Sequence, residues 1–85
     1  MSWQVYILEC KDRKLYTGIT NDLERRIREH NSGNGCRFTK YRRPVKLLYN
    51  EELPNKIKAL GREAEIKGLT KKRKLLLINA GPSAC

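Results

Sequence analysis

The chain has 85 residues, which limits it to one small domain with one modest core. Its 19 lysines and arginines against 9 acidic residues give a formal net charge of +10, which indicates a polyanionic partner, most simply a nucleic acid, ahead of a membrane surface. No apolar run is long enough to span a bilayer, and the three scattered cysteines form neither a disulfide framework nor a zinc motif, so we expect a cytoplasmic protein with reduced thiols.

Two short apolar and aromatic runs near the N-terminus predict a β-hairpin. The first covers Trp3–Cys10 and the second Leu15–Thr20, with a short polar segment between them. Because side chains alternate between the two faces of a strand, a loop of two or four residues would place Tyr6 and Tyr16 on opposite faces. Their hydroxyls can share one site only if the turn has an odd number of residues or a strand carries a bulge.

A helix is expected directly after the hairpin. Asn21 or Asp22 can cap its N-terminus, and Glu24 stands three residues after Asn21 in a capping-box arrangement. Leu23 and Ile27 are four residues apart and form its buried stripe. The rest of the chain predicts a short basic helix within 36–43, a strand over 45–49, a helix from 55 to about 67, and a last helix from 70 to 81. This order, β-β-α-α-β-α-α, predicts a small sheet covered by helices in a single domain over 1–85, with its core at about 3–81.

Several residues of the N-terminal half have both an ordinary and a functional interpretation. Tyr6 and Tyr16 are either sheet aromatics with hydroxyls at the rim, or groups that orient a water and hold a phosphate oxygen. Arg26 is either a surface arginine or a cation that neutralises charge on a scissile phosphate. His30, one turn later, is either structural or able to shuttle a proton at neutral pH. Gly18 either relieves crowding in its strand or allows close approach of a substrate backbone.

Glu63 is a carboxylate that is expected to lean toward the core. The apolar stripe of its helix is predicted to run through Ile57, Leu60 and Ala64, with Ala59 alongside, and Glu63 lies next to this stripe. A carboxylate near a core needs a partner, because burying it unpaired is costly. Either it pairs with an arginine, or it holds a divalent ion such as Mg²⁺, which needs only one or two carboxylates.

The spacing of these residues resembles that of the GIY-YIG nuclease family. The two triplets of the family fall on Gln4-Val5-Tyr6 and Tyr16-Thr17-Gly18, so that the tyrosines are ten positions apart. Arg26 matches the family arginine, His30 matches a histidine that some members carry, and Glu63 matches the metal-binding glutamate. The resemblance covers nearly the whole chain and looks closest to small stand-alone bacterial members.

The chain departs from the family pattern at a few positions. Gln4 stands in place of the first glycine, and Thr17 in place of the central isoleucine or valine. Asn79 is a candidate for a family asparagine near the C-terminus. These 85 residues contain no zinc finger or helix-hairpin-helix of the kind that directs related nucleases to a target, so the choice of target stays open.

The resemblance implies an α/β fold of the α+β type, with a three-stranded antiparallel sheet flanked by helices. It also implies a metal-dependent endonuclease that hydrolyses DNA phosphodiesters, with branched or damaged DNA as a candidate substrate. In that reaction Glu63 would hold one Mg²⁺ or Mn²⁺, and Arg26 would stabilise the charge that develops on the phosphate. Tyr6 would activate or orient the attacking water, assisted by Tyr16 and His30.

Two other interpretations remain open. The chain could be a catalytically silent nucleic-acid-binding module, or a basic adaptor within a larger repair complex. In the silent module, binding would fall steeply with salt and would come from Arg37, Lys40, Arg42, Arg43 and the run 71–74.

Overall fold

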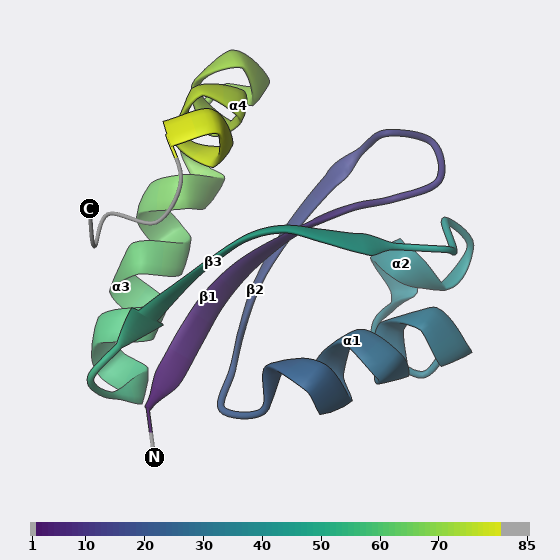
Figure 1. The fold of residues 1–85 in the computed structure, drawn as a ribbon, viewed down its shortest axis with the longest axis horizontal. Coiled ribbons are helices and arrows are strands. Elements are labelled where there is room, and N and C mark those ends of the chain that lie inside the picture. The colour runs from purple at the N-terminus through teal and green to yellow at the C-terminus, as the bar shows by residue number, and fades with distance from the viewer. Residues whose placement is uncertain (1, 81–85) are drawn as a thin grey trace.

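The computed structural model describes residues 2–80, which form a three-stranded antiparallel sheet with helices on both faces (Figure 1). The order of elements and the fold class match the sequence-based prediction. In chain order the elements are β1 (Trp3–Glu9), β2 (Leu15–Thr20), α1 (Leu23–Ser32), α2 (Arg37–Lys40), β3 (Lys46–Leu53), α3 (Lys56–Lys67) and α4 (Lys71–Ala80). Within residues 2–80, no helix is long and apolar enough to cross a membrane.

The sheet has the strand order β2-β1-β3, so β1 is central and pairs antiparallel with both neighbours. In the hairpin, Tyr6 lies opposite Gly18 and Leu8 lies opposite Tyr16. Directly opposed residues share a face, and Tyr6 and Leu8 are two positions apart, so both tyrosines lie on the same face. The turn between the paired strands contains five residues, 10–14, an odd number as the shared site requires.

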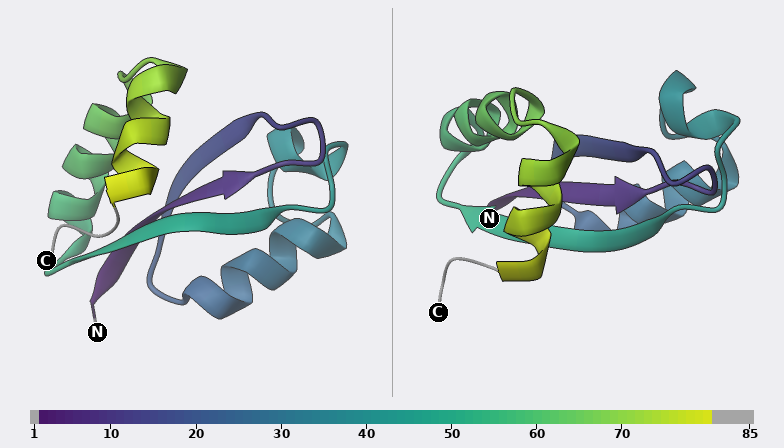
Figure 2. Two further views of the ribbon diagram at one scale, coloured as in Figure 1. Left: turned by 45° about the horizontal axis from the view of Figure 1, so that its top comes forward. Right: turned by 90° about the horizontal axis from the view of Figure 1, so that it is seen from above.

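One face of the sheet packs against α3 and α4. Its buried residues Val5, Ile7 and Tyr49 contact Ala59 and Ile66 of α3, and partly buried side chains of α4 complete this core. Figure 2 shows α3 and α4 on this side and α1 on the other side of the sheet. This face therefore forms the main apolar core.

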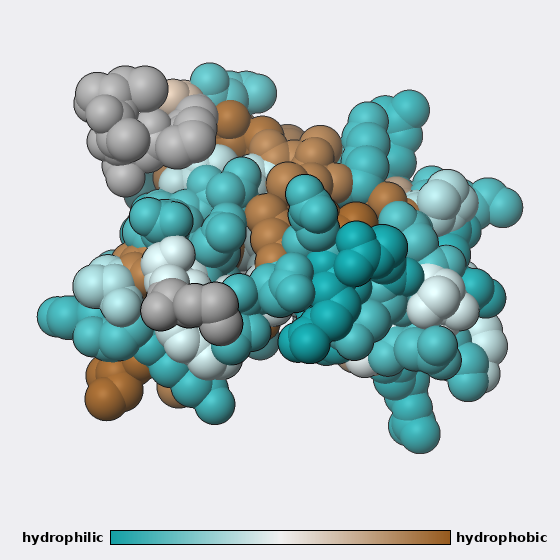
Figure 3. All heavy atoms as spheres, turned by 60° about the horizontal axis from the view of Figure 1, so that its bottom comes forward, coloured by the Kyte–Doolittle hydropathy of each residue, from teal (hydrophilic) through white to brown (hydrophobic). Residues whose placement is uncertain are grey.

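The opposite face carries Tyr6 and packs against α1 and α2. Its buried residues Tyr6, Leu8, Cys10 and Val45 contact partly buried side chains, among them Leu23 and Ile27, as predicted for α1, together with Tyr16 and Phe38. Hydrophilic residues cover much of the outer surface on this side, where α1 lies (Figure 3). Aromatic rings and hydroxyls thus lie beneath a charged surface.

The helix caps match the sequence signals, with one change. Asp22, rather than Asn21, caps α1, and its Oδ1 accepts a hydrogen bond from the Arg25 backbone N–H at 3.2 Å. Arg25 is therefore the third helical residue, so Glu24 is one position too early to complete a capping box. Gly33 ends α1 with φ of 91°, a left-handed conformation that glycine adopts without strain.

The caps of α3 and α4 are the residues at which the two helices were predicted to begin. The Asn55 side chain accepts from the Lys58 backbone N–H at 2.9 Å, and the Thr70 hydroxyl accepts from the Arg73 backbone N–H at 3.2 Å. The predicted end of the last helix at Gly81 lies outside the described residues.

The predicted apolar stripe of α3 was wrong. Ile57 is 80% exposed and Leu60 is 46% exposed. The inward face instead runs through Ala59, the partly buried Arg62 and Glu63, and Ile66, with the spacing of one helical face. A small alanine at the contact point lets the helix approach the sheet, and this rotates the larger apolar residues outward. Glu63 nevertheless lies on the inward side.

Candidate active site

Gly18 makes room for the phenol ring of Tyr6. A Cβ atom at Gly18 would lie 2.6 Å from the Tyr6 hydroxyl oxygen and 3.1 Å from Cε2 of Tyr16. Of the two interpretations of this glycine, relief of crowding within the sheet is the one that the geometry supports. The phenol of Tyr6 fills the space that a substrate backbone would need.

His30 lies at the centre of the site and is fully buried. Its Nε2 lies 3.0 Å from the Tyr6 hydroxyl, and its Nδ1 lies 2.7 Å from the Thr39 hydroxyl. Burial, and then the positive charge of Arg26, lower the pKa of His30 from 6.5 to about 4. The lowered pKa favours the neutral imidazole at pH 7.

The hydrogen bonds around His30 can be assigned a direction. The Thr39 hydroxyl donates to the Cys36 carbonyl oxygen at 3.3 Å, so it accepts from Nδ1–H of His30. This leaves Nε2 of His30 as an acceptor for the Tyr6 hydroxyl. The Arg26 guanidinium lies beside the Tyr6 oxygen and attracts its lone pairs. The Tyr6 O–H bond therefore points away from Arg26, toward His30. We therefore assign one continuous chain from Tyr6 through His30 to Thr39.

Tyr16 completes an aromatic cluster on this face. Its ring centroid lies 5.2 Å from that of His30, 5.7 Å from that of Phe38 and 6.3 Å from that of Tyr6. Burial, and then a hydrogen bond with Cys36, raise the pKa of Tyr16 well above its ordinary value, so the hydroxyl stays protonated. Tyr6 is 1% exposed, whereas Tyr16 keeps some solvent contact. Tyr16 is therefore the phenol that a substrate can reach.

Arg26 is the cation at the edge of this cluster. Its Nη1 donates to Glu29 Oε1 at 3.0 Å and its Nη2 donates to the Gly35 carbonyl oxygen at 3.5 Å. A guanidinium has five N–H donors, so further donors remain for a ligand. Burial raises the pKa of the Tyr6 phenol, while the adjacent Arg26 charge opposes that rise.

Glu63 approaches the site from α3. Its side chain is 17% exposed and pairs with Lys67 at 3.3 Å, so the expected partner is a lysine of the next helical turn and not an arginine. Burial is the main cause of the raised pKa of Tyr6, and the charges of Cys36 and then Glu63 add to it. α3 packs on the face of the sheet opposite Tyr6, and among the described residues the contact that the carboxylate makes is the ion pair with Lys67.

The carboxylate of Glu63 suits Mg²⁺ or Mn²⁺ better than Zn²⁺. Among residues 2–80 there is no cluster of three histidine, cysteine, aspartate or glutamate side chains that could hold an ion. A zinc site needs three or four such ligands. A single partly buried carboxylate fits Mg²⁺ or Mn²⁺, because Mg²⁺ commonly takes one or two protein carboxylates and completes its shell with water and substrate oxygens. Glu63 is the residue that fits this role.

Two of the predicted substrate-binding arginines are engaged in hydrogen bonds within the protein. Arg42 donates to Asp12 Oδ2 at 3.0 Å and to the Phe38 carbonyl at 2.8 Å, and its guanidinium lies over the Phe38 ring. Arg43 donates to the carbonyl oxygens of Lys40, at 3.0 Å, and Asn31, at 3.4 Å. These contacts give both arginines a structural role.

Other predicted basic residues extend into solvent. Arg37 and Lys40 on α2 are exposed, and so are Lys71, Lys72 and Arg73 in the first turn of α4. Asn79 is also exposed, on α4. The contacts described above connect neither Asn79 nor the α4 lysines to the aromatic cluster.

Thr39 and Gly35 belong to the site but were not predicted from the sequence. Thr39 is fully buried and sets the orientation of His30. A Cβ atom at Gly35 would collide with the His30 ring at Nδ1 and at Cγ, the latter at 2.7 Å. The two glycines of the Gly33-Asn34-Gly35 segment are the sequence signal that points to a close approach at this loop.

Comparison with known proteins decides the family. Residues 2–76 match the family profile described as the GIY-YIG catalytic domain. The chain belongs to the GIY-YIG family. The resemblance expected from the two tyrosine triplets is thereby confirmed.

Small relatives match this GIY-YIG domain over most of their length. A UPF0213 protein of Staphylococcus saprophyticus is 51% identical over 77 residues, which cover 91% of this chain and 94% of the relative. One from Clostridium perfringens is 55% identical over 76 residues, 89% of this chain and 82% of the relative. The solution NMR structure of a UPF0213 protein from Bacillus halodurans has a TM-score of 0.62 at 42% identity, covering 94% of this chain and 85% of that chain.

Proposed function

We propose that this GIY-YIG domain is a metal-dependent endonuclease that hydrolyses phosphodiester bonds in DNA. The observation that carries the proposal is the Tyr6–His30–Thr39 hydrogen-bond chain with the Arg26 cation beside it. Membership of the family and the net charge of +10 support a nucleic-acid substrate. Branched or damaged DNA is the substrate form that we propose first.

Arg26 and Glu63 supply the two opposite charges that such a reaction needs. The unused N–H donors of Arg26 bind oxygens of the scissile phosphate and stabilise the charge that builds up in the transition state. Glu63 would hold Mg²⁺ or Mn²⁺, which would supply a Lewis acid for the leaving oxygen. Its ion pair with the exposed Lys67 is weak enough to exchange for a metal.

The two tyrosines take different roles from those first expected. Tyr16 reaches the substrate and, because its raised pKa keeps it protonated, donates a hydrogen bond to a phosphate oxygen or to the attacking water. Tyr6 is too buried to contact that water. It instead supports the Arg26 cation through its oxygen and donates a hydrogen bond to Nε2 of the neutral His30.

A catalytically silent binding module is the second candidate. The exposed cations of α2, Arg37 and Lys40, favour it, because they can bind a nucleic-acid backbone without any chemistry. In that case the buried hydrogen-bond chain would serve stability alone. The two candidates differ in whether DNA is cut, and not in whether DNA is bound.

The deciding experiment measures cleavage and binding on the same DNA. Supercoiled plasmid and a branched duplex are incubated with the purified protein and Mn²⁺, Mg²⁺ or EDTA. We expect metal-dependent nicking that Glu63→Gln abolishes and that Glu65→Gln, an exposed carboxylate two residues along α3, retains. DNA that shifts in a gel but is never cut with any metal supports the silent module.

A further inference from the structure

An exposed aromatic ring stands beside the candidate active site. Tyr41 directly follows α2 and is 80% exposed, although a tyrosine side chain usually buries most of its apolar area. The Nζ atom of Lys40 lies 5.5 Å from the ring centroid, so the ring is flanked by a cation. Neither apolar core of the described residues includes Tyr41.

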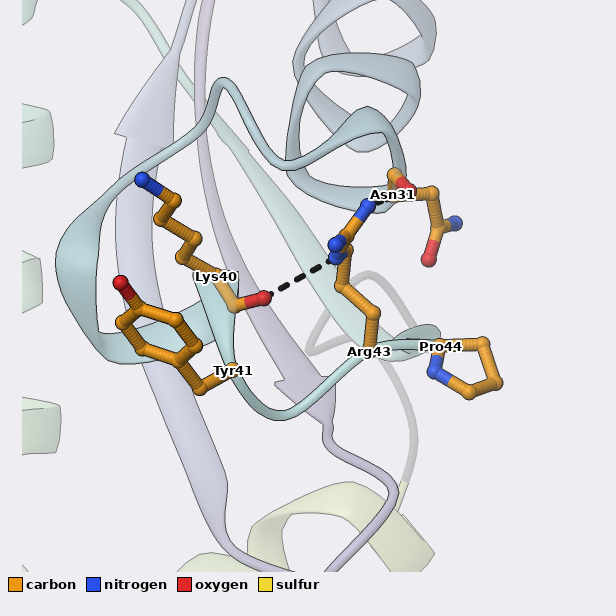
Figure 4. A pocket seen from close by; sticks show the side chains of 5 residues that line it. All are labelled: Asn31, Lys40, Tyr41, Arg43 and Pro44. Carbon is orange, nitrogen blue, oxygen red and sulfur yellow. Dashed lines mark hydrogen bonds between the residues drawn. The ribbon is translucent and has the colours of Figure 1, made fainter.

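Tyr41 and Lys40 form a ridge between two hollows. The first hollow, of about 560 Å³, is lined by Asn31, Lys40, Tyr41, Arg43 and Pro44. Figure 4 shows Lys40 and Tyr41 on one side of it, facing Arg43 and Pro44 on the other. The second hollow, of about 320 Å³, shares Lys40 and Tyr41 and adds Arg37 and the loop from Gly33 to Cys36.

The second hollow leads to the candidate active site. Gly35 lines this hollow, and its carbonyl oxygen accepts the hydrogen bond from Arg26. Cys36 lines it as well, and its sulfur lies 3.6 Å from the Thr39 hydroxyl that holds His30. A strand lying over Tyr41 would therefore continue toward Arg26.

The charge of this surface is of one sign. Arg37 and Lys40 are exposed on α2, and Arg43 lines the first hollow. No residue from 31 to 44, the segment that lines both hollows, is acidic. The ligand that fits combines negative charges with a flat apolar face close to them. Nucleotides have this combination, and their bases stack on aromatic side chains in proteins that bind single strands.

We propose that Tyr41 stacks on an unpaired base of a single-stranded segment, while Arg37 and Lys40 contact the flanking phosphates. In a paired duplex the base faces are covered by their neighbours, so only unpaired bases can offer a face to this ring. The inference rests on the proposed function and adds a substrate form to it. The enzyme then engages DNA where strands are separated, as at a branch or an end.

The test measures binding in EDTA, where no cleavage interferes. Fluorescence anisotropy compares a labelled single strand with the duplex of the same sequence, at one fixed salt concentration. We expect Tyr41→Ala to weaken single-strand binding by about tenfold or more and duplex binding by less than about twofold. Tyr41→Trp should retain binding. Ile57→Ala, which removes an equally exposed side chain at 80%, is the matched control and should change neither affinity.

The outcomes separate this proposal from the endonuclease function. Equal loss for single strand and duplex, or no loss with Tyr41→Ala, overturns the stacking role even if the wild-type protein cuts DNA. A selective loss of single-strand binding supports stacking even if no metal produces cleavage. Tighter binding to anionic lipid vesicles than to either oligonucleotide also overturns it, because a lipid headgroup presents charge without a stackable ring.

Discussion

The Thr39 hydroxyl lies 2.7 Å from Nδ1 of His30, and both residues are fully buried. This contact fixes which imidazole nitrogen carries the proton, and so leaves Nε2 free to accept from Tyr6. A threonine on a helix of four residues thereby determines the state of a histidine on a different helix.

Replacing Thr39 by valine should destabilise the protein and impair the site. The change keeps the shape but leaves Nδ1–H of His30 buried without an acceptor, which costs about 1–3 kcal/mol. Urea unfolding measures the stability, and plasmid nicking the activity. Thr39→Ser keeps the hydroxyl and should be much closer to wild type in both. If the valine and serine variants behave alike, the hydrogen bond has no directing role.

The buried His30 predicts a pH dependence of stability. Its pKa is about 4 in the fold against 6.5 when unfolded, so the unfolded chain binds more protons between these values. The contribution of neutral His30 is therefore complete above pH 6.5 and is lost as the pH falls toward 4, by about 3 kcal/mol in total. Urea midpoints measured from pH 4 to pH 7 check this. His30→Phe should flatten that part of the curve, and an unchanged slope would refute the assignment.

The same lowered pKa predicts the shape of the pH–rate profile. A proton shuttle titrating at 6.5 would give nicking an ascending limb around that pH, whereas the buried His30 stays neutral there. We expect His30→Gln to lower the nicking rate without moving any limb between pH 6 and 8. If wild-type nicking shows a limb near pH 6.5 that disappears in this variant, His30 acts as a proton shuttle after all.

Gly18→Ala tests the close approach of Tyr6. Because the new Cβ would lie 2.6 Å from the Tyr6 oxygen, the phenol must shift, at a cost of about 1–3 kcal/mol and with loss of its contact to His30. Thermal unfolding and nicking should both be affected. Gly61→Ala is the matched control: nothing lies within 4 Å of its Cβ, and this helical position should gain about 0.5–1 kcal/mol.

Arg26→Ala tests the phosphate-binding cation. Loss of one electrostatic contact in the transition state lowers the rate by about 10²–10³. Arg25→Ala removes a neighbouring arginine whose side chain is 60% exposed, and should retain most of the nicking activity. Circular dichroism of both variants verifies the fold. Equal activity of the two variants would remove Arg26 from the mechanism.

Local patterns in the sequence were sufficient for much of the fold. Caps at Asn55 and Thr70, and the alternation that requires an odd hairpin turn, depend on neighbours along the chain. The third strand was predicted too short, because it continues through Asn50 and Glu51 to Leu53. Asn50 and Glu51 are tolerated in the strand because side chains distant in the sequence form a hydrogen bond or an ion pair with them.

Those distant partners explain the longer strand. The Asn50 amide donates to Gln4 at 2.8 Å, and Glu51 pairs with Arg62 at 3.1 Å. These two contacts join residues that are 46 and 11 positions apart in the sequence, so no periodic pattern indicates them. The roles of Thr39 and Gly35 at the site are of the same kind, since they depend on how α2 and the loop pack against His30.

The strand order gives two identical amino acids different chemistry. Tyr6 belongs to the central strand, where neighbours on both sides close it off from water, while Tyr16 belongs to the edge strand β2. The two side chains are chemically identical, so their difference comes from their positions in the sheet alone. A tyrosine on the central strand is part of a buried hydrogen-bond network, whereas one on the edge strand stays accessible to a ligand. In this domain, topology assigns the function of a residue that its side chain alone leaves undetermined.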